Sequence, residues 1–158
     1  NLMTLNSWKN KKIFILGGGK QWRPLVHLKD LISAFQLVEK ENNLEKINKQ
    51  VFNVGGNKQN FQVYQVAQAF KAYFPDLVIE EIPDDPDQRS YQVDFTKIQK
   101  TLGFLPQKTI EDGILEIKDG LEKGLVTDEL KTITVKYYKY LIEADKILSN
   151  LKINNKLF

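Results

Sequence analysis

Few of the side chains that normally carry catalysis are available in this sequence. His27 is the only histidine and there is no cysteine, so a catalytic triad has one imidazole at most and thiolate chemistry is excluded. No Asp, Glu and His side chains show metal-ligand spacing. The acidic residues Asp84, Asp85 and Asp87 could bind a hard cation, but a solvated acidic loop is the simpler interpretation. The residues themselves therefore predict a domain without an active site of its own.

Two glycine runs could in principle hold phosphate groups. Gly17 to Gly19 and Gly55–Gly56 both follow short apolar segments. Neither matches the G-x-G-x-x-G or P-loop pattern, so tight turns are the better interpretation. No tyrosine is followed four positions later by a lysine. The 158 residues thus lack both a dinucleotide-binding loop and a Tyr-x-x-x-Lys pair.

The composition is that of a globular protein. A hydrophobic fraction of 42% argues against disorder. The 23 basic and 20 acidic residues leave a net charge of +3, and the lysines are scattered, which argues against a nucleic-acid surface. No apolar run approaches the roughly 20 residues of a membrane-spanning helix, and no secretory signal pattern opens the chain. Together with the lack of cysteine, these features predict a cytoplasmic protein.

Apolar periodicity predicts short strands that alternate with helices. Strands are expected at 12–16, 51–54 and 78–82. Helices are expected at about 30–40 and 63–74, from Thr96 to Gly103, and from Thr109 to just before Gly124. Asp30 is expected to cap the first helix, whose wide apolar face should be well buried. The pattern indicates an α/β arrangement. The segment 51–54 looks like a buried parallel strand whose neighbours this chain does not clearly supply.

The end of the chain has a different pattern. Apolar side chains recur at alternating spacings of three and four residues and predict a long amphipathic helix. They are Leu130, Ile133, Tyr137, Leu141, Ala144, Leu148 and Leu151. Such a seam usually forms a core or a partner contact.

Five pieces in order resemble the extended short-chain dehydrogenase/reductase family. The residues at 17–31 read GGGKQWRPLVHLKDL, where a glycine turn leads to an arginine, a short strand, His-Leu-x-Asp and a helix. FNVGG follows at 52–56, DQRSYQVD-x-TK at 87–97, and LGF-x-P with TIEDGI at 102–114. Asn1-Leu2-Met3 resembles the point where such enzymes enter their substrate region. The resemblance extends from Asn1 to about Gly124.

This resemblance implies NAD(P)-dependent epimerases, dehydratases, reductases or decarboxylases that act on nucleoside-diphosphate sugars. It implies an α/β fold, the C-terminal part of a Rossmann-type epimerase/dehydratase, with few short strands, several helices and a long C-terminal helix. Residues 1–126 would form the substrate-binding part, including the last strand and helix of the Rossmann sheet, and 127–158 a helical tail. Because the first residue is Asn1 and not Met, we expect the chain to continue a longer gene product.

The family's substrate contacts are carried over residue by residue. Asn1 and Leu2 would touch the diphosphate side, Phe14 and Leu16 the base, Gln62 the nucleoside pocket, and Asp87 and Tyr91 the ribose. Arg23 would pair with the diphosphate, although a surface salt bridge is the plain alternative.

At the position of Asp84, many relatives carry a second phosphate arginine, and a carboxylate there would repel a diphosphate. Arg89 would take over that role, or would instead pair with Asp85 or Asp87. His27 is expected to be a hydrogen-bonded structural residue. Asn53 would satisfy loop backbone groups or touch ligand.

The predicted function is therefore binding of the nucleoside diphosphate of a sugar nucleotide. Hydride exchange with NAD or NADP would take place on a missing N-terminal Rossmann part, and this segment alone would bind no cofactor and be inactive. The intact enzyme would be a homo-oligomer. The alternative is a non-catalytic truncated or split module that acts in binding or assembly through the tail helix.

Overall fold

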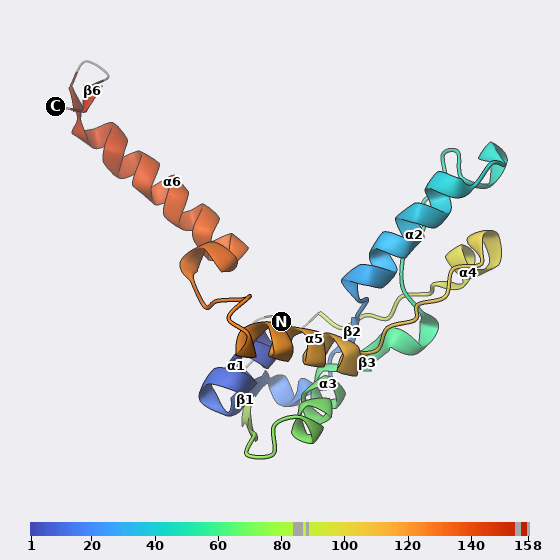
Figure 1. Cartoon of the computed structure of the whole chain (residues 1–158), viewed down its shortest axis with the longest axis horizontal. Helices are drawn as coiled ribbons and strands as arrows, with labels where there is room; N and C mark the ends of the chain where they lie inside the picture. The colour runs from blue at the N-terminus through green and yellow to red at the C-terminus, as the bar shows by residue number, and fades with distance from the viewer. Residues whose placement is uncertain (84–86, 88, 154–155, 158) are drawn as a thin grey trace. The chain divides into compact units, whose positions relative to one another are not determined.

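The computed structural model describes residues 1–83, 87, 89–153 and 156–157, and the chain divides into two compact units, Asn1–Asp119 and Gly120–Phe158. Figure 1 shows the order of the elements. The helices are α1 (Leu2–Asn10), α2 (Leu28–Lys40), α3 (Val63–Ala69), α4 (Thr96–Leu102), α5 (Ile110–Glu122) and α6 (Thr134–Leu151). The strands are β1 (Lys12–Leu16), β2 (Trp22–Pro24), β3 (Asn60–Gln62), β4 (Val78–Ile82), β5 (Lys152–Ile153) and β6 (Lys156–Leu157). Short 3-10 turns are η1 (Gly17–Gly19), η2 (Leu44–Lys46), η3 (Asn57–Gln59), η4 (Phe70–Ala72) and η5 (Leu130–Thr132).

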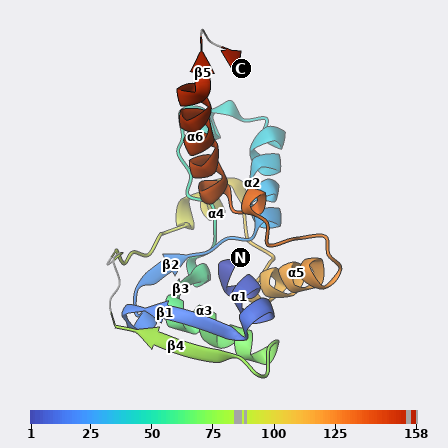
Figure 2. The ribbon, with the colours of Figure 1, turned by 90° about the vertical axis from the view of Figure 1, so that its left-hand side faces the viewer.

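The first unit is built on a parallel pair of strands. β1 and β4 run side by side (Figure 2), and their register places Lys12 opposite Val78 and Leu16 opposite Ile82. The buried residues of α3, η4 and α5 pack against β1 because its alternate side chains are apolar. This core consists of Ile13, Ile15, Ala67, Phe70, Phe74, Leu77 and Ile114. The predicted strands at 12–16 and 78–82 are thus confirmed, as is the α/β class.

The turn after β1 depends on glycine. All three residues of η1 have positive φ, at 58°, 68° and 66°. A side chain at Gly19 would place its Cβ 2.5 Å from Cγ2 of Ile15 and 2.8 Å from the Tyr64 nitrogen. Only glycine accommodates both this backbone conformation and this close approach. The run is therefore a tight turn between β1 and β2, as predicted.

A second core joins α2, α4 and the segment between α4 and α5. It consists of Ala34, Phe95, Ile98 and Phe104. The prediction that α2 is well buried was wrong: Ile32 is 48% and Phe35 69% exposed. Within the described chain only one side of the helix finds apolar partners, so the rest of its wide apolar face stays open to solvent.

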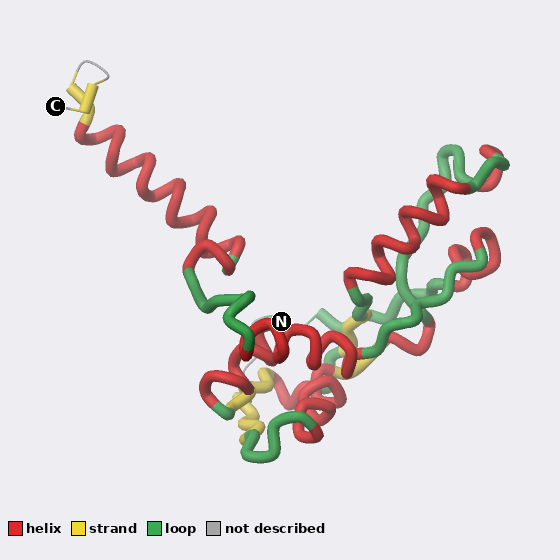
Figure 3. Tube along the Cα trace, viewed as in Figure 1, coloured by secondary structure: helices red, strands yellow, loops and turns green. Residues whose placement is uncertain are grey.

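The predicted strand at 51–54 was also wrong. The residues there have no assigned strand structure, and Figure 3 shows the segment between α2 and β3 mainly as loop. Phe52 and Val54 pack against the second core, while Val51 is 80% exposed. An isolated strand leaves its backbone groups unpaired, and no described strand lies beside this one.

The predicted capping box begins α5. The Thr109 N–H donates to the Asp112 carboxylate at 2.9 Å, and the Asp112 N–H donates to the Thr109 hydroxyl at 3.2 Å. Gly124, with φ of 67°, follows the end of the helix.

The second unit consists mainly of α6, which confirms the predicted long amphipathic helix. Its apolar side chains are largely exposed within the described chain, among them Tyr140 at 54% and Ile147 at 56%. A hairpin of β5 and β6 follows, with Lys152 opposite Leu157. Among the described residues, no helix has the length and hydropathy needed to cross a bilayer.

Candidate functional site

A short antiparallel ladder positions the predicted phosphate arginine. β2 pairs with β3 so that Trp22 lies opposite Gln62 and Arg23 opposite Phe61. The segment after residue 88 docks on the same ladder, because the Trp22 N–H donates to the Ser90 hydroxyl at 3.0 Å and the Tyr91 N–H donates to the Trp22 carbonyl at 3.4 Å. Two segments more than 60 residues apart are thereby held together at Arg23.

Four predicted site residues meet there and form what we call the arginine cluster: Arg23, Asp87, Arg89 and Tyr91. Nη2 of Arg23 lies 3.3 Å from Oδ2 of Asp87, and its guanidinium carbon lies 5.4 Å from the centre of the Tyr91 ring. Nη1 of Arg23 donates to the carbonyls of Trp22 and Arg89. Arg89 forms a two-pronged pair with Asp87, from Nε to Oδ1 at 2.6 Å and from Nη2 to Oδ2 at 2.7 Å.

The electrostatics of the cluster follow from this arrangement. The hydrogen bonds from Arg89, with a smaller contribution from Arg23, hold the pKa of Asp87 well below its usual range. The same pairing raises the pKa of Arg89. Asp87 and Arg89 are therefore both ionised at neutral pH, and the formal charges of the two guanidinium groups and the carboxylate sum to +1. The Arg23 side chain is 23% exposed and the Arg89 side chain 79%, so Arg89 is the more accessible cation.

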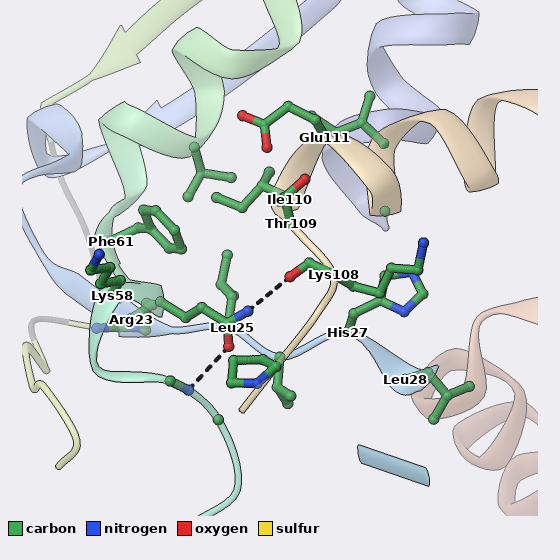
Figure 4. Close-up of a pocket in the computed structure, with 18 of the residues that line it drawn as sticks. Arg23, Leu25, His27, Leu28, Lys58, Phe61, Lys108, Thr109, Ile110 and Glu111 are labelled. Carbon is green, nitrogen blue, oxygen red and sulfur yellow. Dashed lines mark hydrogen bonds between the residues drawn. The ribbon is translucent and has the colours of Figure 1, made fainter. Parts of the chain in front are cut away.

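Arg23 also lines a cavity of about 1130 Å³ in the first unit. Its walls come from β2, β3, α3 and the segment that leads into α5, and most are apolar. In Figure 4, Arg23, Lys58 and Phe61 lie on one side of the cavity, and His27 and Leu28 on the other. An apolar cavity with cations at one side suits a ligand that has both a flat apolar part and negative charge.

Side-chain amides hold the loops around this cavity in place. The Gln59 side chain accepts from the Gly56 N–H at 3.1 Å and donates to the Lys108 carbonyl at 2.9 Å (dashed lines in Figure 4). Asn60 accepts from the Val93 N–H at 2.9 Å and donates to the Val93 carbonyl at 3.0 Å. Sequence reasoning missed these residues, and their only signal was a run of amides after a glycine pair.

The remaining predicted contacts lie on neighbouring elements. Asn1 lines the cavity with Arg23, whereas Leu2 is 63% exposed at the start of α1. Phe14 is 49% exposed on β1 beneath the Lys12 ammonium, and Leu16 ends that strand. The Gln62 side chain donates to the Lys20 carbonyl at 3.1 Å and so ties β3 to the glycine turn. No contact described in the structure joins Leu2, Phe14 or Leu16 to the arginine cluster.

The helix cap of α2 was predicted incorrectly. His27, not Asp30, is the N-cap, and its Nδ1 accepts from the Lys29 N–H at 3.1 Å. Asp30 is 3% exposed, and its carboxylate accepts from the backbone N–H groups of Gln107 at 2.9 Å and Lys108 at 3.0 Å. A carboxylate that accepts two main-chain bonds holds a distant segment against the helix, which spacing along α2 alone does not reveal.

Other predicted residues have structural contacts. Nε2 of His27 lies 3.2 Å from the Glu116 carboxylate, which confirms the expected structural role. The hydrogen bond from Lys29, assisted by His27, lowers the pKa of Glu116. The Asn53 amide donates to the Asp94 carbonyl at 3.3 Å. Asp84 and Asp85 lie outside the described residues.

Dinucleotide and metal sites each have a recognisable residue pattern. Neither glycine turn has the three-glycine spacing that holds a pyrophosphate at a helix N-terminus. Within the described ranges, no group of three or more His, Cys, Asp and Glu side chains could hold a metal ion.

The parallel β1–β4 pair packed against α3 and α5 is an α/β arrangement, and solved structures of nucleotide-sugar epimerases and dehydratases share this fold. A dTDP-glucose 4,6-dehydratase from Bacillus anthracis in complex with NAD matches with a TM-score of 0.62 and 26% identity, covering 77% of this chain and 38% of that one. A UDP-glucose 4-epimerase from Thermotoga maritima with UDP-glucose matches the fold with a TM-score of 0.66 at 23% identity, covering 79% and 39%.

Sequence comparison also finds nucleotide-sugar epimerases and dehydratases. The chain is 29% identical over 113 residues to CDP-paratose 2-epimerase from Salmonella typhi, covering 70% of this chain and 33% of that protein. It is 29% identical over 124 residues to a dTDP-glucose 4,6-dehydratase from Escherichia coli strain K12, covering 72% and 33%. No family model matches.

The resemblance inferred from the sequence is thus confirmed, because the chain is similar in sequence and in fold to nucleotide-sugar epimerases and dehydratases. It spans about a third of the length of the curated relatives that it matches.

Proposed function

We propose that this chain is the C-terminal, nucleoside-diphosphate-binding part of a nucleotide-sugar epimerase or dehydratase. The observation that carries the proposal is the convergence of Arg23, Arg89, Asp87 and Tyr91 at one point, in a chain related to enzymes of this class. Guanidinium groups bind phosphate oxygens through paired, charge-assisted hydrogen bonds.

In this proposal, Arg89 approaches the diphosphate from the solvent side and Arg23 supports it from the ladder. Tyr91 contributes at the ribose end, and Gln62 lines the nucleoside pocket. Phe14 and Leu16 offer apolar contact to the base, and Asn1 and Leu2 lie near the diphosphate. The resemblance also assigns Asp87 to the ribose end.

Hydride exchange with NAD or NADP would be supplied by a Rossmann part that these 158 residues do not include. Open apolar surface supports such a partner. Leu28, Phe35 and Val51 are 66%, 69% and 80% exposed, and large apolar surfaces of this kind mark interaction sites. The intact enzyme would also form a homo-oligomer.

The test is calorimetric titration of the chain with UDP, CDP, dTDP and NAD. We expect one or more of the nucleoside diphosphates to bind and NAD not to bind. Micromolar NAD binding would contradict the proposal. Reading the gene upstream of the Asn1 codon provides a second test, because an in-frame G-x-x-G-x-x-G turn and a Tyr-x-x-x-Lys are expected there.

Arg23 variants measure the cluster's contribution. Hydrogen bonds to charged groups are worth about 1.5–3 kcal/mol. Arg23→Ala should therefore raise the nucleoside-diphosphate Kd roughly ten- to a hundredfold. Arg23→Lys should restore only part of the affinity, because an ammonium keeps the charge and loses the fork. An Arg23→Ala chain that unfolds at lower urea and also loses ligand would indicate a structural role instead.

A second candidate is an assembly module, and one observation favours it. The apolar stripe of α6 from Ile133 to Leu151 lies outside the resemblance and is largely exposed. Self-association without any nucleotide binding would support this alternative.

A further inference from the structure

The Asp87 carboxylate contacts both arginine side chains of the chain. The sequence contains two arginines, Arg23 and Arg89, and both guanidinium groups contact the Asp87 carboxylate. They come from segments 66 residues apart. The 21 other basic and 19 other acidic side chains of the chain offer many simpler pairings, so convergence of both arginines on one carboxylate is a specific feature of Asp87.

The geometry of the pair is that of an arginine bound to an anion. Nε and Nη2 of Arg89 donate in parallel to the two carboxylate oxygens, at 2.6 and 2.7 Å. The Arg89 backbone N–H adds a bond to Oδ1 at 3.3 Å, and Nη2 of Arg23 reaches Oδ2 from the other side, also at 3.3 Å. Phosphate oxygens accept the same fork of donors, so the carboxylate lies where a phosphate group would be bound.

The anchoring of the two arginines is unequal. Arg23 is fixed by the carbonyls of Trp22 and Arg89 and by the Tyr91 ring, and its direction does not depend on Asp87 alone. Arg89 has 79% of its side chain exposed, and its described partners are oxygens of Asp87. Exposed ion pairs contribute little net stability, so an incoming anion can displace this carboxylate at small cost.

We infer that Asp87 is an internal stand-in for a phosphate group, which aligns Arg23 and Arg89 in the free protein and leaves them when a diphosphate binds. The inference rests on the proposed function and changes one assignment within it, because Asp87 then competes with the ligand and does not bind its ribose. The carboxylate sets the affinity of the site: it keeps the guanidinium groups in place, and it opposes the ligand through its own negative charge.

Asp87→Asn separates these two roles. Asparagine has the same shape and keeps one oxygen to accept from Arg89, but it removes the negative charge. We expect Asp87→Asn to bind pyrophosphate and the preferred nucleoside diphosphate about tenfold more tightly than the wild-type chain, a change that corresponds to about 1.4 kcal/mol. Arg89→Gln should abolish the gain when combined with Asp87→Asn.

Asp76→Asn is the matched control, because it makes the same change in net charge at an exposed residue. Asp76 precedes β4 and is not part of the arginine cluster. This control should change neither affinity. The arginine Nε–H resonances provide a second readout, since wild-type Arg89 should shift when pyrophosphate replaces Asp87.

The titrations distinguish the possible outcomes. Tighter binding of both ligands to Asp87→Asn supports the stand-in. Unchanged pyrophosphate binding with weaker nucleoside-diphosphate binding would overturn it in favour of a ribose contact, and the proposed function would stand. A gain for pyrophosphate without any preference for nucleoside diphosphates would support the stand-in and contradict the proposed function. Absence of binding in every variant would refute both.

Discussion

Replacing Asp30 by alanine tests how the segment between α4 and α5 is held against α2. The carboxylate is 3% exposed and accepts two main-chain hydrogen bonds, from Gln107 and Lys108. Bonds to charged groups contribute about 1.5–3 kcal/mol each, and water can recover part of the loss at the new cavity. An acidic residue in the first turn also interacts favourably with the helix dipole, by about 0.5 kcal/mol. We therefore expect Asp30→Ala to lower the free energy of unfolding by about 3–4 kcal/mol.

The effect is large compared with the stability of a typical domain, about 5–15 kcal/mol. With a slope near 2 kcal/mol per molar urea, the midpoint should fall by roughly 1.5–2 M. The assay is urea unfolding followed by circular dichroism and tryptophan fluorescence. Asp30→Asn should lose about half as much, because its amide oxygen can still accept one of the two bonds.

Asp76→Ala is the control for removing an exposed aspartate, and it should change stability by less than about 0.5 kcal/mol. If Asp30→Ala also stays within about 0.5 kcal/mol of the wild type, the two main-chain bonds do not hold this segment, and the reasoning fails.

Three other perturbations give separate tests. Gly19→Ala should lower the free energy of unfolding by more than about 2 kcal/mol in the urea assay, since its Cβ would lie 2.5 Å from a side-chain carbon of β1. Gly18→Ala is the control, because Gly18 also has a positive φ but its Cβ would have no atom nearer than 3.8 Å. It should lower the free energy of unfolding by only about 1 kcal/mol. Ile147→Asp on α6 should reduce self-association measured by sedimentation velocity, and an unchanged distribution would exclude the helix as the contact. Because pairing with Arg89 lowers the pKa of Asp87, this ion pair is fully formed above the ordinary pKa of 3.8 and is lost only as the pH falls through the lower pKa of the folded state. The Arg89 Nε–H resonance should therefore stay constant from pH 7 to 4.5.

Local signals in the sequence predicted the framework of the first unit. The strands β1 and β4 have apolar runs with clear ends, and the glycine turn needs three consecutive positive φ angles that only this residue type readily adopts. The box formed by Thr109 and Asp112 is likewise a contact between residues three apart. Patterns of this range are readable because every participant lies within one turn or strand.

The failures involve partners that local patterns do not specify. Asp30 has a suitable residue type for a cap, but its carboxylate bonds to residues 77 and 78 positions away, and His27 takes the cap. The segment 51–54 has the composition of a buried strand and lacks a strand to pair with in the described chain. Strand propensity describes fit to a sheet, so it predicts a strand only where the sheet exists.

The contacts among the candidate site residues were predicted only in part. The resemblance selected Arg23, Asp87, Arg89 and Tyr91 as separate ligand contacts, and the fold brings the four together. The pairing of Arg89 with Asp87 was one of the alternatives, but the contact of Arg23 with the same carboxylate was not predicted. The β2–β3 ladder and the docking of 90–93 on it create that contact, and nothing in either segment alone indicates it.

In the first unit, the hydrogen-bonded ladder that carries the arginine cluster and the exposed apolar surface lie on different elements. Side-chain amide bonds tie the ladder that carries the arginine cluster to the end of the glycine turn, to the segment before α4 and to the segment before α5, all within the described chain. The open apolar surface lies instead on α2 and at Val51, around the second core. Under the proposed function, anion binding would depend on contacts within the described chain, whereas catalysis would depend on a proposed Rossmann part that covers the open surface. Nucleotide affinity and enzymatic activity should then be separable, with the first measurable on the 158 residues and the second only when the proposed Rossmann part is present.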